Sequence, residues 1–174
     1  GGLSLTTAFL GFIYSISYTT AAVTLFMLAL MPFLASLIAF IFLKEKISKQ
    51  NFVSMVIALL GTIVMIYASA FSGSFFGLIM GFVSSLGFAA FSVALRSKSD
   101  IKKFYILIYG GIFCAFFSAI LMIINNQDFY IPIKNVYLSM THGSLVACGL
   151  ILFSIGSKQL LSGELTMLSL LEVV

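Results

Sequence analysis

The sequence predicts an all-α polytopic membrane protein, folded as a helical bundle. Of its 174 residues, 61% are hydrophobic and only 8% are charged, whereas soluble domains are about 45–50% apolar and about 25% charged. The charged residues also come in short groups, separated by uncharged stretches long enough to cross a bilayer. No stretch alternates with the period of two that a membrane strand barrel requires. The chain is therefore expected in a lipid bilayer.

Seven spanning segments follow from the uncharged stretches and from the turn residues that divide the two longest of them. Residues 17–20 (Ser-Tyr-Thr-Thr) divide the first stretch, and residues 72–74 (Ser-Gly-Ser) divide the second. The predicted helical segments are 3–19, 21–43, 52–70, 75–95, 104–124, 139–157 and 160–174. Lengths of about 20 residues favour spanning helices over shorter buried core helices.

The distribution of Lys and Arg predicts the orientation of these segments. The loops 44–51 and 96–103 and the loop around residue 158 carry eight of the nine basic residues, and the opposite loops carry only Lys134. Loops on the cytoplasmic side of membrane proteins are enriched in Lys and Arg. We therefore expect a multi-pass protein of the cell (inner) membrane with these three loops in the cytoplasm. The same topology explains the formal net charge of +4, so no nucleic-acid partner is predicted.

Both ends of the chain predict a fragment of a longer protein. The sequence begins with Gly1-Gly2, without an initiator Met or a signal-peptide pattern. It stops at Val174, about 15 residues into the seventh segment, where a helix would leave its last carbonyls unsatisfied in lipid.

Small residues and one proline predict how the helices pack and bend. Four small residues recur every four positions in and just before the fourth segment, which is the spacing that lets membrane helices approach closely. They are Gly73, Gly77, Gly81 and Ser85. Pro32 lies in the middle of segment 21–43, where it removes a helical hydrogen bond and is expected to kink the helix. A purely structural kink and a hinge that lines a pathway both remain open.

Glu172 is the most informative polar residue. It lies between apolar neighbours about 18 Å into the seventh segment by helical rise, and a carboxylate near the bilayer midplane is a functional-site hypothesis by default. We expect Glu172 to bind a cationic group or a coupling proton. The alternative is a structural partner for a hydroxyl or an amine elsewhere in the bundle.

Three further residues are candidates for contact with a solute or an ion. Tyr14 could stack on a solute, whereas Tyr18, four residues later, is expected to anchor the helix at the interface. His142 opens the sixth segment and titrates in a range that suits a proton-linked step, although a lone interfacial histidine often has no special role. Glu164 lies near Lys158, where a surface ion pair is the alternative to a transport role.

Enzymatic motifs are not found in the sequence. It contains no HExxH, no GxSxG and no Cys/His cluster with metal-ligand spacing. We therefore expect no enzyme, no catalytic residue, no metal and no cofactor.

Three short runs carry a family resemblance through their order and spacing. They are Ser17-Tyr18-Thr19-Thr20-Ala21-Ala22, Leu30-Met31-Pro32-Phe33-Leu34-Ala35 and Phe42-Leu43-Lys44-Glu45-Lys46-Ile47-Ser48. Together they resemble the first-repeat signature of the EamA-type transporters in the drug/metabolite transporter superfamily. Residues 171–174 (Leu-Glu-Val-Val) resemble the "lEPv" motif of the second repeat. Lys44 stands where glycine is usual before Glu45, a departure expected to change only a loop.

The resemblance implies about ten helices in two inverted repeats, of which this chain would cover about the third to the ninth. Residues 1–70 would form the C-terminal part of the first repeat, and residues 75–174 the N-terminal part of the second. Glu45 and its neighbouring lysines would hold the cytoplasmic end of their helix.

These features predict a secondary transporter that exports small metabolites such as amino acids or drugs by alternating access. Its central cavity would be lined by segments 3–19, 21–43, 75–95, 139–157 and 160–174. The expected partners are a small-molecule solute, with proton coupling as an option, and the lipid bilayer; a homodimer is left open. The alternative is a non-transporting receptor or scaffold. That class predicts a conspicuous polar loop for its partner, and the longest outer loop spans only residues 125–135.

Overall fold

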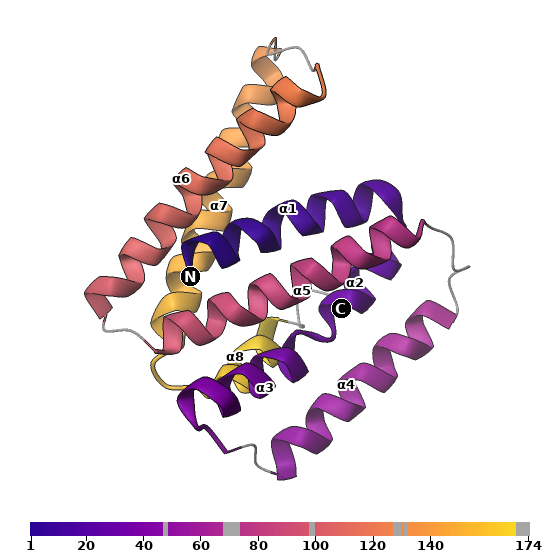
Figure 1. Cartoon of the computed structure of the whole chain (residues 1–174), viewed down its shortest axis with the longest axis vertical. Helices are drawn as coiled ribbons and strands as arrows, with labels where there is room; N and C mark the ends of the chain where they lie inside the picture. Colours follow the sequence, from indigo (N-terminus) through magenta and orange to yellow (C-terminus); the bar gives the residue numbers. More distant parts are fainter. Residues whose placement is uncertain (47–48, 68–73, 98–99, 127–129, 131, 170–174) are drawn as a thin grey trace.

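The computed structural model describes the chain except for residues 47–48, 68–73, 98–99, 127–129, 131 and 170–174. The described residues form eight helices (Figure 1). They are α1 (Gly2–Tyr18), α2 (Ala21–Leu28), α3 (Met31–Leu43), α4 (Lys49–Tyr67), α5 (Phe75–Arg96), α6 (Asp100–Ile124), α7 (Ile133–Gly156) and α8 (Ser162–Ser169). The predicted all-α fold is confirmed.

Four stretches of the described chain are long and apolar enough to cross a membrane. They are Ala21–Leu43, which joins α2 and α3, Phe75–Arg96, Phe104–Ile124 and Ile133–Gly156. Helix α1 is a shorter apolar helix of 17 residues. These lengths match a hydrocarbon layer of about 30 Å, so the chain is a multi-pass membrane protein.

Helix α7 begins earlier than the sequence predicted. It starts at Ile133, whereas the predicted segment began at residue 139. Pro132 precedes the helix with φ at −53°, and its carbonyl accepts the first helical hydrogen bond from Val136 at 3.2 Å. The uncharged stretch marks the apolar part alone, because a helix can extend past it with exposed polar residues such as Lys134.

Helices α1 and α5 form the most closely packed pair, and glycine makes this approach possible. A Cβ atom on Gly87 of α5 would lie 2.7 Å from the Ala8 nitrogen, and one on Gly11 of α1 would lie 2.8 Å from the Met80 oxygen. The two backbones are therefore in direct contact. Ser84 strengthens the pair, because its hydroxyl donates a hydrogen bond to the Ala8 carbonyl at 2.7 Å.

The predicted small-residue stripe divides between two partners. Gly77 packs against Tyr18 at the end of α1, while a Cβ atom on Gly81 would lie 2.8 Å from the Ser15 hydroxyl and 2.9 Å from the Met27 side chain. Gly73, the first member of the stripe, lies outside the described residues. The stripe thus packs α5 against α1 and against the end of α2.

The apolar span 21–43 is interrupted just before its proline. Residues 29–30 form a turn between α2 and α3, and Pro32 occupies the first turn of α3. Proline has no N–H to donate to the preceding turn, which is why the helix breaks at this point. Ser85 of α5 donates a hydrogen bond to the carbonyl of Met27 at 2.6 Å, so a main-chain acceptor beside the break has a partner.

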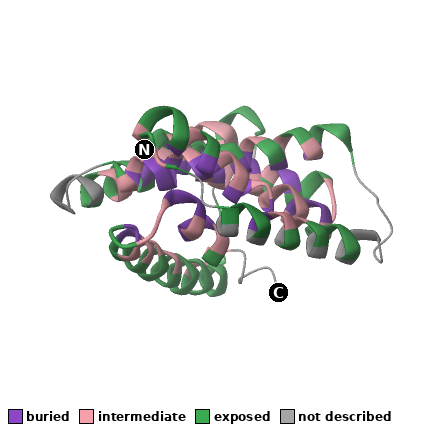
Figure 2. Ribbon diagram, turned by 90° about the horizontal axis from the view of Figure 1, so that it is seen from below, coloured by how far each residue is buried: buried purple, intermediate pink, exposed green. Residues whose placement is uncertain are grey.

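Helices α6 and α7 form a hairpin that projects away from the other helices (Figure 1). Only 6% of an 18-residue stretch of each is buried, against 50% in α5. Buried residues gather in the middle of the bundle, and outer faces are exposed (Figure 2). The Cβ direction of Gly111 in α6 meets nothing within 4 Å, whereas a Cβ atom on the neighbouring Gly110 would lie 2.8 Å from the Leu5 side chain of α1.

The three loops predicted to share one side of the membrane lie at one end of the structure. Glu45 after α3 and Arg96 at the end of α5 are in contact, and Arg96 also reaches the carbonyls of Ser157 and Lys158 after α7. Lys44 ends α3 in the left-handed region, with φ at 56° and ψ at 29°. The backbone therefore turns sharply there, and the Glu45 N–H donates back to the Ala39 carbonyl at 3.3 Å.

Candidate solute cavity

A cavity of about 720 Å³ lies between four helices, α1, α5, α7 and α8. Its lining is mostly apolar and aromatic. The lining residues are Phe9, Phe88, His142, Leu145, Val146, Gly149, Leu150, Leu152, Phe153, Gly156, Leu160, Leu165, Leu168 and Ser169. Four of the five segments expected around a central cavity therefore line it, and segment 21–43 does not. A cavity of this size holds a small organic molecule.

Two phenylalanines form one wall of the cavity, and a third packs behind them. Phe88 of α5 and Phe153 of α7 both line it, with ring centroids 5.6 Å apart and planes at 72°. Phe91, which is fully buried, stacks on Phe153 at 6.2 Å and meets Phe88 edge-on at 5.7 Å. Such offset and edge-to-face arrangements are the favourable geometries of aromatic pairs. The wall is thus a packed aromatic surface, held from behind by a ring that solvent does not reach.

The described lining contains no Asp, Glu, Lys or Arg side chain. His142, on α7, and Ser169, at the end of α8, are its polar side chains. An uncharged cavity lined mainly by hydrocarbon favours the apolar part of a solute, because transfer of apolar surface from water is favourable. Within the described part of the chain, no group of His, Cys, Asp and Glu is placed to hold a metal ion.

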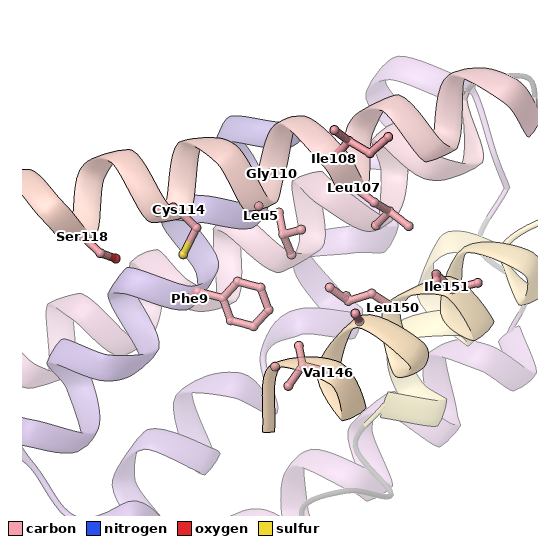
Figure 3. Close-up of a pocket in the computed structure, with 14 residues that line it drawn as sticks. Leu5, Phe9, Leu107, Ile108, Gly110, Cys114, Ser118, Val146, Leu150 and Ile151 are labelled. Carbon is pink, nitrogen blue, oxygen red and sulfur yellow. The ribbon is translucent and has the colours of Figure 1, made fainter. Parts of the chain in front are cut away.

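A second, strongly apolar pocket of about 500 Å³ adjoins the cavity between α1, α6 and α7 (Figure 3). Leu5 and Phe9 of α1 point into it, with Cys114 and Ser118 on the α6 side and Leu150 on the α7 side. Phe9 and Leu150 line both this pocket and the larger cavity. The side chains of Phe9 and Leu150 therefore separate the second pocket from the larger cavity.

Tyr14 lines a third pocket, of about 400 Å³, between α1 and α6. Its ring stacks on that of Tyr18 at 6.4 Å, and Phe76 meets both rings edge-on. Ser118 lines this pocket as well as the second one. Tyr14 and His142, both candidates from the sequence, thus lie in different pockets.

The remaining sequence candidates fall outside the cavity or outside the described residues. Glu164 accepts a hydrogen bond from the Leu161 N–H at 3.1 Å, which satisfies a donor at the start of α8. Glu45, predicted to hold the cytoplasmic end of its helix, forms an ion pair with Arg96 at 3.1 Å. Glu172 lies outside the described residues, three positions after Ser169, a lining residue.

A comparison with protein families adds to this geometry. The model of the EamA-like transporter family matches residues 1–67. The match covers less than half of the 174 residues, and it shows that this part of the chain is similar to EamA-like transporters. This family consists of membrane transporters of the drug/metabolite superfamily, so the match supports the class of protein that the signature residues predicted. No curated protein and no solved structure matches the chain significantly.

The EamA-like segment contains α1 to α4, and α1 contributes Phe9 to the cavity. Residues of α5, α7 and α8 supply the rest of the cavity wall, so the cavity lies between the matched segment and the chain that follows it. Sequence reasoning did not find the aromatic wall or the role of Arg96. The pair Phe88 and Phe91, three positions apart on one helical face, was the available signal for the wall.

Proposed function

We propose that this EamA-like chain acts in a secondary transporter that exports small metabolites, such as amino acids or drugs, by alternating access. One observation carries the proposal, the cavity of about 720 Å³ between α1, α5, α7 and α8 of a multi-pass membrane protein. A solute site between membrane helices, within reach of both predicted halves of the chain, is what alternating access requires.

The cavity is placed where two halves could move around it. Phe9 belongs to the half predicted over residues 1–70, and the other lining residues belong to the half predicted over residues 75–174. If the halves rock against each other, Phe9 changes its distance from Phe88 and Phe153 across the cavity. Solute held between these rings would then be exposed on one side of the membrane at a time.

Glu172 supplies the polar contact in this proposal. Residues 165, 168 and 169 line the cavity. In the predicted helical segment 160–174, position 172 would share one face with them. A carboxylate on that face would bind the cationic group of a solute or a coupling proton. His142 on the opposite helix would add a second group that can exchange a proton. Tyr14, in its separate pocket, would contact solute that has left the cavity.

The experiment is untargeted mass spectrometry of the medium of cells that express the protein or its Glu172→Gln variant, with empty-vector cells as the baseline. We expect one class of solute to accumulate outside with the unchanged protein and to fall to the baseline with Glu172→Gln. The matched control is Glu164→Gln, because the Glu164 carboxylate accepts a hydrogen bond from the Leu161 N–H at the start of α8, and this variant should still export. Equal media from the unchanged protein and the empty vector, together with equal uptake in the reverse assay, would overturn the proposal.

A further inference from the structure

Arg96 joins three parts of the chain at one end of the bundle. Its Nε donates to Glu45 Oε1 at 3.1 Å, and its Nη1 donates to the carbonyls of Ser157 at 3.2 Å and Lys158 at 2.8 Å. The planar guanidinium group presents several donors in a fixed fork, so one side chain can hold both a carboxylate and a helix end. These contacts connect the ends of α3, α5 and α7.

Glu45 extends the connection to a fourth helix. While Oε1 accepts from Arg96, Oε2 accepts from the main-chain N–H of Ser162 at 3.2 Å. Ser162 is the first residue of α8, where unsatisfied N–H groups favour a negative charge. The carboxylate therefore neutralises a cation and caps a helix at once. Both side chains are largely shielded, with exposed fractions of 26% for Arg96 and 17% for Glu45.

This ion pair lies at the end of the cavity where α7 stops and α8 starts. Gly156, Leu160 and Leu165 line the cavity, and the groups that bind Arg96 and Glu45 are their chain neighbours at 157, 158 and 162. The hairpin of α6 and α7 starts at this end of the bundle, and its other end projects away from the remaining helices (Figure 1). The ion pair thus ties together the helix ends that surround one mouth of the cavity.

The tie also joins the two predicted halves. Glu45 belongs to residues 1–70, whereas Arg96 and Ser162 belong to residues 75–174. Any rocking that opens this mouth must separate Glu45 from its partners. Within the described residues, the Ser162 hydroxyl is the buried side-chain oxygen that has no hydrogen-bond partner. A buried unpaired hydroxyl destabilises the arrangement that contains it. It therefore lowers the free energy needed to separate these helix ends.

We propose that the Glu45–Arg96 ion pair is a latch that keeps this mouth of the cavity closed and is released when the mouth opens. The proposal rests on the proposed function, because a latch between halves presupposes that they move. Loss of either charge removes the attraction that favours the closed state. The population of the open state therefore rises without any change in the cavity wall.

Cysteine accessibility tests the latch without any knowledge of the solute. Gly156→Cys places a thiol on the cavity wall beside the latch, where an added Cβ has only Leu165 at 3.9 Å as a close neighbour. The native thiols are removed by Cys114→Ala and Cys148→Ala. A charged, membrane-impermeant maleimide is then applied to inside-out vesicles, so that it reaches the mouth that charge distribution predicts to be cytoplasmic.

In this background, Glu45→Gln and Arg96→Gln are each expected to raise the labelling rate roughly three- to tenfold. The double variant should gain less than the sum of the two single gains, because both changes remove the shared ion pair. Glu164→Gln is the control, because the Glu164 carboxylate lies at the same end and caps α8 from within its own turn. This variant should label at about the rate of the unchanged protein.

Unchanged labelling in both single variants, or additive effects in the double variant, would refute the latch. Thermal melting of each variant in detergent shows whether it is folded. If Glu45→Gln does not fold, Arg96→Lys replaces it in the test. This variant keeps the positive charge but loses the forked donors, so its increase in labelling rate should be smaller than that of Arg96→Gln. The two proposals fail separately. Raised labelling with no exported solute would keep the latch and reject the transport role, whereas export with unchanged labelling would do the reverse.

Discussion

The hydroxyl of Ser85 on α5 lies 2.6 Å from the main-chain oxygen of Met27, the last but one residue of α2. The span that crosses the membrane as α2 and α3 is interrupted directly after this point, before Pro32. A hydrogen bond from a neighbouring helix thus supports the backbone one residue before Leu28, whose carbonyl lacks the helical donor that Pro32 cannot supply. The bend at Pro32 is therefore held by two helices and not by the proline alone.

Removal of this hydroxyl should destabilise the protein. For Ser85→Ala we expect a loss of about 1 kcal/mol, the usual value of an interhelical hydrogen bond in a membrane protein. Thermal unfolding in detergent measures the change. Ser97→Ala is the control, because the Ser97 hydroxyl is exposed and bonds within its own helix, to the Ala94 carbonyl. Equal melting temperatures for the two variants would mean that the Ser85 contact contributes no stability.

The contact between α1 and α5 should tolerate no added side chain. A Cβ on Gly87 would meet the Ala8 nitrogen at 2.7 Å and the Ser4 oxygen at 2.8 Å, and main-chain atoms cannot move aside cheaply. We expect Gly87→Val to cost at least about 1–3 kcal/mol through overpacking. Gly111→Val is the matched control, since nothing lies within 4 Å of its added Cβ. Expression yield and melting temperature should separate the two variants, and similar values would argue against this helix contact.

Lys44 should be a site where glycine stabilises the fold. Its φ of 56° lies in the left-handed region, which costs a residue with a Cβ roughly 1 kcal/mol or more and costs glycine almost nothing. Lys44→Gly should therefore raise the melting temperature by about 2–4 °C. Lys46→Gly is the control, because Lys46 is not among the described residues with positive φ. A lower melting temperature for Lys44→Gly would show that the lysine side chain contributes more than the backbone loses.

This position also shows what the sequence could predict. The family signature places glycine before Glu45, and the departure to Lys44 was expected to change only a loop. The structure places that departure at the left-handed residue that ends α3. The glycine of the family motif therefore indicates a left-handed backbone conformation at this position, because glycine adopts that conformation most readily.

Helix positions were predictable because an uncharged apolar stretch must form its hydrogen bonds internally in lipid. Contacts between residues of different helices were not predictable in this way. Arg96 and Glu45 are separated by 51 positions, so only the packing of α3 against α5 could bring them together. Tyr14 and His142 lie in different pockets because the hairpin of α6 and α7 diverges from α1. The hydrophobic periodicity of the sequence does not predict this angle.

The aromatic wall leads to a prediction about solute affinity. Phe153 lines the cavity and stacks on the buried ring of Phe91, so it presents a fixed aromatic face to any solute between α1 and α7. Phe153→Leu keeps an apolar side chain but removes the ring contacts, which are worth about 0.5–1.5 kcal/mol for an aromatic pair. We expect the KM for export of an identified solute to rise roughly two- to tenfold, with a smaller change in kcat. Ile155→Ala tests the specificity of the effect, because Ile155 lies on the same helix, is 52% exposed and does not line the cavity. If both variants raised KM equally, the effect would belong to the stability of α7 and not to the aromatic wall.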